Sequence, residues 1–138
     1  MKKVTTVKEC LPVVVGRIFQ RGDEVKEIIP LNNERHYLLV THKGMKYYLL
    51  FKRSFFMKYG EIFKDRGQKG VGESINVEYL KLARDYKVDY ILIYYQDGRI
   101  YHIDPNTWFD FARRFRTIRT TKDGETTYSI PVSMLRRW

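Results

Sequence analysis

The alternation of apolar and polar residues divides the first part of the chain into a helix and several strands. The opening segment TVKECLPVVVGRIFQRG begins with Thr6 three residues ahead of Glu9, which is the capping-box pattern of a helix start, and it predicts a helix that ends near Gly22. Three β-rich runs follow: EVKEIIP, RHYLLVTH and KYYLLF. Short turns rich in Asn, Lys and Gly separate these runs, so we expect an antiparallel three-stranded meander.

The second part of the chain continues with a glycine-rich loop, FKDRGQKGVGES, at residues 63–74. Ser74 is a suitable N-cap for the helix INVEYLKLARDY, and the almost wholly apolar run DYILIYY predicts a central strand. A hairpin into RIYHI, a helix NTWFDFARRF, a second hairpin and a short tail at residues 133–138 complete the pattern. We therefore expect a single domain over residues 1–138 with an α/β (α+β) fold: a mixed sheet flanked by helices, plus a C-terminal helix and hairpin.

Composition narrows the partners that this fold could bind. The chain has 138 residues, a formal net charge of +10 and an aromatic content of 15%. Such a charge attracts polyanions, and aromatic rings supply surfaces on which bases stack. Cys10 is the single cysteine, so the sequence excludes an internal disulfide and a cysteine-based zinc site. No apolar run is long enough for a membrane span or a signal-peptide core, so we expect a cytoplasmic protein and no membrane partner.

The charges are grouped in blocks along the chain. Residues 43–70 contain eight Lys or Arg and two acids, whereas residues 73–110 contain seven acids and four bases. Residues 113–122 contain five bases and no acid. A solvated, charged surface is the simplest interpretation, but basic blocks interleaved with aromatic residues favour contact with phosphates and unpaired bases.

The loop RGQKGVGES is open to two interpretations. Three glycines and a lysine ahead of a helix start can present main-chain amides to a phosphate, and the same residues can form a simple connector. A Walker A loop is excluded, because Glu73 follows Gly72 where Lys and then Ser or Thr would be needed.

The order helix, three-stranded meander, loop, helix and apolar strand, over residues 6–95, resembles the core of the restriction-endonuclease-like (PD-(D/E)xK) nucleases. The similarity is closest to members of the archaeal Holliday-junction-resolvase type. The resemblance implies a third strand ending in carboxylate-x-Lys, an Asp on the second strand and a Glu on the first helix. It also implies that the carboxylates of this set hold Mg²⁺ or Mn²⁺. Lys52 matches the motif lysine and Glu9 matches the helix glutamate.

Two positions depart from that motif. Leu50 stands where the resemblance requires a carboxylate, and RHYLLVTH contains no Asp. Glu73 could fold back beside Lys52 as a migrated carboxylate and metal ligand, which would make Lys52, Glu73 and Glu9 the candidate catalytic residues. Glu24, Glu27 and Glu34 are further candidate carboxylates.

These observations support three hypotheses. The first is a basic protein that binds nucleic acid, preferably DNA, on a nuclease-like scaffold. The second is an active nuclease that depends on Mg²⁺ or Mn²⁺, and the third is an interaction domain for an acidic protein partner. A homodimer is a further expectation, since strand edges can pair. The candidate phosphate-binding residues are Lys52, Arg53, Lys58, Lys64, Arg66, Lys69, Arg113, Arg114, Arg116 and Arg119.

Overall fold

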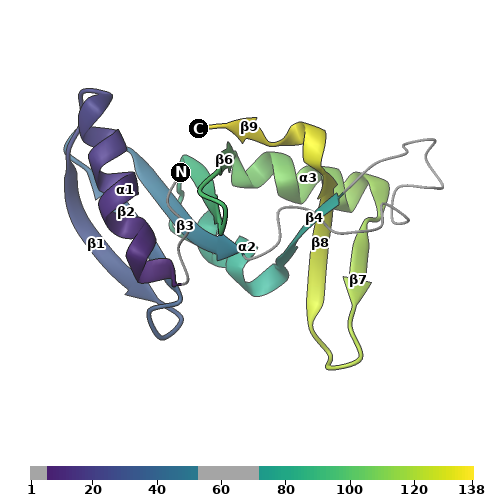
Figure 1. The fold of residues 1–138 in the computed structure, drawn as a ribbon. Coiled ribbons are helices and arrows are strands. Elements are labelled where there is room, and N and C mark those ends of the chain that lie inside the picture. The colour runs from purple at the N-terminus through teal and green to yellow at the C-terminus, as the bar shows by residue number, and fades with distance from the viewer. Residues whose placement is uncertain (1–5, 53–71) are drawn as a thin grey trace.

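The computed structural model describes residues 6–52 and 72–138 and confirms a mixed α/β fold (Figure 1). A six-stranded sheet has the order β1-β2-β3-β5-β6-β9, and a three-stranded sheet has the order β4-β8-β7. The elements are α1 (Val7–Gln20), β1 (Val25–Leu31), β2 (His36–Thr41), β3 (Lys46–Lys52), β4 (Gly72–Asn76), α2 (Val77–Asp85), β5 (Tyr90–Tyr95), β6 (Ile100–Ile103), α3 (Pro105–Phe115), β7 (Ile118–Thr120), β8 (Thr126–Pro131) and β9 (Arg136–Arg137).

The predicted helix and meander form where the local pattern places them. The Thr6 side chain accepts a hydrogen bond from the main-chain nitrogen of Glu9, at 3.4 Å, and so caps α1. Strands β1, β2 and β3 pair in antiparallel order, and β3 then pairs in parallel with β5. This parallel pair makes the sheet mixed, as predicted.

Helices cover both faces of the large sheet. Cys10, Val14 and Ile18 recur every four residues on α1 and are buried against one face, together with Tyr47 and Leu49 of β3. The opposite face packs on α2, α3 and strands β4 and β8. Side chains alternate along β3, so even-numbered residues of this strand point toward that second layer.

Strand β4 corrects the prediction for residues 72–76. These residues were assigned to the end of a loop and the start of a helix, with Ser74 as the cap. They form a strand instead, because Ile75 is buried opposite Tyr128 of β8 and Ser74 pairs with Ser129. The helix begins two residues later than predicted, and the side chain of Asn76 caps it by accepting from the main-chain nitrogen of Glu78, at 2.7 Å.

The C-terminal segment also differs from the predicted tail. After a 3₁₀ turn at Val132–Met134, β9 pairs with β6, and the Trp138 main-chain nitrogen donates to the Ile100 carbonyl at 2.9 Å. Arg17 of α1 donates to the Trp138 carbonyl at 2.8 Å, and the Arg21 guanidinium lies 4.3 Å from the indole centroid. The segment is therefore part of the core that α1 covers. Across the described ranges, no helix is long and apolar enough to cross a membrane.

We predict that Trp138→Ala lowers the free energy of unfolding by about 3 kcal/mol, because the indole is 7% exposed and its loss leaves a cavity beneath α1. Urea denaturation would measure this change. Arg136→Ala, at an exposed neighbouring position, should change stability by less than about 0.5 kcal/mol. Equal losses in the two variants would contradict the packing role of Trp138.

Candidate functional site

Lys52 is the last residue of β3, and its strand position aims it at the second layer of the fold. It lies in register with Tyr95 of the parallel neighbour β5. Two residues earlier on the same side of β3, Leu50 is 3% exposed and belongs to the apolar core. Lys52 therefore stands where a buried apolar face gives way to the surface, and 26% of its side chain is exposed.

Glu73 of β4 meets Lys52 across the two sheets. The Lys52 Nζ atom lies 2.5 Å from Glu73 Oε1, which also accepts the main-chain N–H of Ser74 at 3.2 Å. The Tyr95 hydroxyl donates to Glu73 Oε2 at 2.9 Å. The carboxylate is only 3% exposed, so these donors replace the water that a buried charge would otherwise need.

The lysine ammonium is engaged in the same network. Besides Glu73, Lys52 Nζ donates to the main-chain carbonyl of Ser74, so two of its three N–H donors have partners on β4. Burial, and after it the Glu73 carboxylate, raise the pKa of Tyr95, which keeps the phenol protonated as a donor. The side chains of Ser74 and Ser129 are 2.6 Å apart and join the network to β8.

A cavity of about 280 Å³ lies beside this network, and we call it the Lys52 cavity. Aromatic rings and polar side chains share its wall. The lining residues are His36, Leu50, Phe51, Lys52, Ser74, Ile75, Asn76, Tyr79, Glu125 and Thr127.

The imidazole of His36 in this wall is neutral at pH 7. Burial, together with the positive charges of Arg35 and Lys52, lowers its pKa to about 4. Its Nδ1 atom is hydrogen-bonded to the Tyr48 hydroxyl at 2.8 Å, and its ring meets Tyr79 edge to face at 4.3 Å between centroids. The imidazole is therefore a packed, uncharged ring.

The residues described do not fit the divalent metal that the nuclease resemblance implies. In residues 6–52 and 72–138, no three His, Cys, Asp or Glu side chains gather closely enough to hold a metal ion. Both oxygens of Glu73 accept hydrogen bonds from Lys52, Ser74 and Tyr95, and Leu50 offers no oxygen ligand. Glu73 as a metal ligand stays a prediction without support from this donor set.

The other candidate carboxylates lie on or near other elements. Glu9 lies on α1, which packs on the opposite face of the large sheet, and its carboxylate accepts from the Thr6 hydroxyl at 3.2 Å. Glu24, Glu27 and Glu34 are exposed on or beside β1, and β2 separates β1 from β3. The Lys52–Glu73 pair is thus the part of the predicted catalytic set that the structure brings together.

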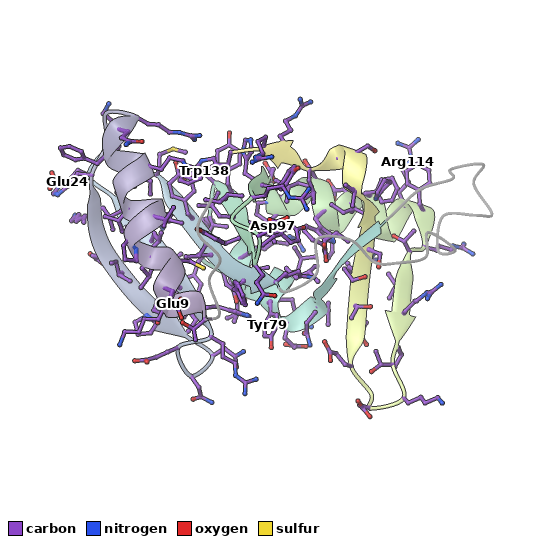
Figure 2. The ribbon with its side chains drawn as sticks, in the orientation of Figure 1. Glu9, Glu24, Tyr79, Asp97, Arg114 and Trp138 are labelled. Carbon is purple, nitrogen blue, oxygen red and sulfur yellow. The ribbon has the colours of Figure 1, made fainter. Side chains whose placement is uncertain are left out.

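The predicted phosphate-binding residues fall into two groups. One group lies outside the described residues: Arg53, Lys58, Lys64, Arg66 and Lys69. The other group, the arginine cluster, is exposed at the end of α3 and on β7: Arg113, Arg114, Arg116 and Arg119. Figure 2 shows Arg114 on the side of the molecule away from Glu9.

Arg116 has an unusual backbone conformation within the arginine cluster. It forms the C-cap of α3 with φ 56° and ψ 41°, in the left-handed region that glycine occupies more readily. A side chain at this position costs about 1 kcal/mol. Lys87, after α2, has a similar φ of 55°.

The glycine-rich loop does not lead directly into a helix, as its proposed phosphate-binding role requires. Gly67 and Gly70 lie outside the described residues, and Gly72 begins β4. The strand β4 therefore separates the loop from α2; β4 pairs with β8, and the Ser74 main-chain N–H donates to Glu73 Oε1. The direct loop-to-helix junction that would hold a phosphate is absent at residues 72–76.

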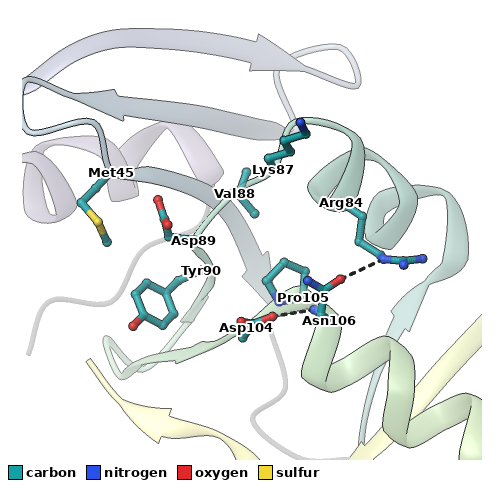
Figure 3. Close-up of a pocket in the computed structure, with 9 residues that line it drawn as sticks. All are labelled: Met45, Arg84, Lys87, Val88, Asp89, Tyr90, Asp104, Pro105 and Asn106. Atoms are coloured by element: carbon teal, nitrogen blue, oxygen red, sulfur yellow. Dashed lines mark hydrogen bonds between the residues drawn. The ribbon is translucent and has the colours of Figure 1, made fainter.

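A larger cavity of about 490 Å³ lies at the other ends of β3 and β5, between the end of α2 and the start of α3 (Figure 3). Some of its polar groups are already paired: Arg84 donates to Asn106 Oδ1 at 3.1 Å. Asp104 Oδ1 accepts from the Asn106 main-chain nitrogen at 2.6 Å. The Asp104 carboxylate thus occupies the N-terminus of α3 and repels an incoming anion there.

Sequence reasoning missed the groups that complete the Glu73 network. Tyr95 was assigned to a strand without a functional role, and its contact with Glu73 follows from the parallel register of β3 and β5. Ser129 and Tyr79 were not singled out either. In GESIN, Glu73 and Ile75 share a face of the strand, and that alternation was the available signal for a buried carboxylate.

Comparison with known proteins shows a shared fold. No protein-family model matches the sequence, and no curated protein matches it. Among solved structures, the chain is similar to a nuclease from a fusselovirus, with a TM-score of 0.50 and 14% sequence identity. The match covers 95% of this chain and 82% of that chain. At this identity the likeness shows a shared fold and leaves activity to be tested.

We predict that Lys52→Met lowers the free energy of unfolding by about 3 kcal/mol, because it leaves the Glu73 carboxylate buried beside neutral donors. Glu73→Gln should cost only about 1–2 kcal/mol, since the partly exposed Lys52 can turn toward water. Urea denaturation of both variants and of the double variant forms a double-mutant cycle. If the changes in the free energy of unfolding of the two single variants add up to that of the double variant, Lys52 and Glu73 do not stabilise each other.

We predict a stability loss on acidification that involves His36. Its folded-state pKa is about 4 and its unfolded value is near 6.5, so only the unfolded state gains a proton as the pH falls between these values. This proton uptake should destabilise the fold by about 2 kcal/mol between pH 7 and pH 4.5. Urea denaturation of the parent protein across this pH range would measure the loss. The free energy of unfolding of His36→Gln should depend on pH less strongly by that amount. An unchanged pH dependence would contradict the assignment.

Proposed function

We propose that the protein binds nucleic acid, preferably DNA, through its phosphate backbone on a nuclease-like scaffold. The arginine cluster is the observation that carries the proposal. Four exposed arginines occur within residues 113–119, and no acid occurs among them. Guanidinium groups bind phosphate oxygens with paired hydrogen bonds, and such contacts supply most of the sequence-independent affinity.

A purely structural role accounts for only part of the arginine cluster. Arg113 and Arg114 lie in the last turn of α3, where positive charge favours the negative end of the helix dipole. That effect does not apply to Arg119 on β7. The same effect also favours Arg116 at the C-cap of α3, although glycine would relax the backbone there. Arg119 is therefore the member of the cluster whose exposed charge this structural role leaves unexplained.

Lys52 has a different place in this proposal. Its charge is compensated by Glu73 at 2.5 Å, so the pair as a whole adds little to long-range attraction of a polyanion. The arginine cluster would attract the phosphate backbone, and Lys52 would contribute one further N–H at short range.

A metal-dependent nuclease is the second candidate, and the contact between Lys52 and Glu73 on a nuclease-like fold is the observation that favours it. The donor set described above does not support a metal site, so this candidate depends on a direct assay. Cleavage of labelled DNA in Mn²⁺ that is lost in chelator and in Glu73→Gln, with binding retained, would establish it. Intact DNA under these conditions would rule out the nuclease hypothesis.

We predict that Arg116→Gly weakens DNA binding by about fivefold at low salt while the fold becomes no less stable. Glycine relieves the left-handed conformation, so the free energy of unfolding should stay unchanged or rise by about 0.5–1 kcal/mol. Fluorescence anisotropy with labelled duplex would measure affinity. For the parent protein, about five neutralised phosphates predict a slope of log K against log salt near −4 to −5.

Lys87→Gly is the matched control, because it removes one positive charge from a similar left-handed position after a helix. Lys87 borders the cavity at the start of α3, at the other end of that helix from the arginine cluster. The affinity of the Lys87→Gly variant for the labelled duplex should differ from that of the parent protein by less than about twofold. Binding that is insensitive to salt, or equal losses in the two variants, would contradict the proposal and favour an acidic protein partner.

A further inference from the structure

We propose that the Lys52 cavity takes one unpaired base of the bound nucleic acid. This inference rests on the proposed function and names the kind of substrate that the site selects: strands in which a base has left the stack. The supporting features are the size of the cavity, its aromatic wall, its polar rim and its position beside a cation.

The size of the cavity suits one base better than a length of duplex. Its volume of about 280 Å³ is just below the range in which pockets hold drug-sized molecules, about 300 Å³ and above. A double helix meets proteins through grooves and phosphates on a broad surface, whereas a flipped or unpaired base enters a pocket.

The wall of the cavity provides rings for stacking. The rings of His36 and Tyr79 line it, and they are held at 88° to each other. Because burial keeps the His36 imidazole neutral, this wall attracts the face of an uncharged ring system more readily than a phosphate.

Polar groups on the rim match the edges of a base. The Asn76 Oδ1 atom is used in capping α2, so the amide nitrogen of this residue is the group that can donate to a base carbonyl or ring nitrogen. Thr127 can donate or accept, and the exposed Glu125 carboxylate can accept from an exocyclic amine.

Lys52 lies in the same wall and completes the environment of a nucleotide. Its ammonium is partly exposed and retains donor capacity beyond Glu73 and Ser74, so it can meet the phosphate next to an inserted base. Among the described residues that line this cavity, a free phosphate or another simple anion would find one cation, Lys52, already compensated by Glu73, beside aromatic surfaces. The combination therefore favours a base with its adjoining phosphate.

The experiment compares two labelled duplexes of equal length, one fully paired and one with a single unpaired 2-aminopurine. We expect the parent protein to bind the second duplex about tenfold more tightly, which is the scale of stacking one base on aromatic side chains. The 2-aminopurine fluorescence should also change on binding. Anisotropy and fluorescence are recorded on the same samples.

Thr127→Phe would fill the cavity from β8, and it should abolish the tenfold preference while leaving affinity for paired duplex within about twofold. Thr120→Phe, on the neighbouring strand β7 and exposed, is the matched control and should keep the preference. Tyr79→Leu removes an aromatic face independently, with the exposed Tyr86→Leu, at the C-cap of the same helix, as its control. Thermal unfolding verifies that each variant is folded.

The outcomes separate this inference from the proposed function. Equal affinity of the parent protein for both duplexes overturns the base-binding cavity and leaves phosphate-backbone binding intact. A preference that survives in folded Thr127→Phe and Tyr79→Leu also overturns it. Failure of both duplexes to bind in a salt-dependent manner overturns the inference together with the function on which it rests.

Discussion

The buried carboxylate of Glu73 is the constraint on which the arrangement of the two sheets depends. An ionised group that is 3% exposed must be compensated by donors at short range. These donors come from β3 (Lys52), β5 (Tyr95) and the β4 main chain at Ser74, so the compensation works only when the small sheet is seated on the large one. Displacing β4 would separate the Glu73 carboxylate from Lys52 and Tyr95, which donate to it. The pair therefore specifies how the two layers meet.

This compensation has a consequence for binding. A lysine that already faces a carboxylate cannot attract a distant polyanion as a solvated arginine does, because the two opposite charges largely cancel beyond short range. In the proposed function, long-range attraction comes from uncompensated charge, and among the described residues we assign this role to the arginine cluster. The Lys52 cavity would then select strands that contain an unpaired base. Attraction and selection are thus assigned to different surfaces of the same fold.

The sequence predicts what local interactions determine and fails where distant pairing decides. The capping of α1 by Thr6 and the tight turns of the meander depend on residues within a few positions of one another, and these predictions are confirmed. GESIN was assigned to a loop and helix start because its strand partner, Ser129, lies 55 residues away from Ser74. Tyr95 reaches Glu73 only through the parallel register with Lys52. Glu73 was predicted beside Lys52 from its chemistry, whereas its burial needed the second sheet.

Leu50 explains in physical terms why a nuclease-like scaffold need not hold a metal at this site. The position lies two residues before Lys52 on the same face of β3, so a carboxylate there would point toward Glu73. Two neighbouring carboxylates repel each other, and a divalent cation is one way to offset that repulsion. Leu50 instead joins the apolar core, and Lys52 becomes the cation that neutralises Glu73. Leu50, together with the missing Asp on β2, thus leaves this strand end built to complete an ion pair.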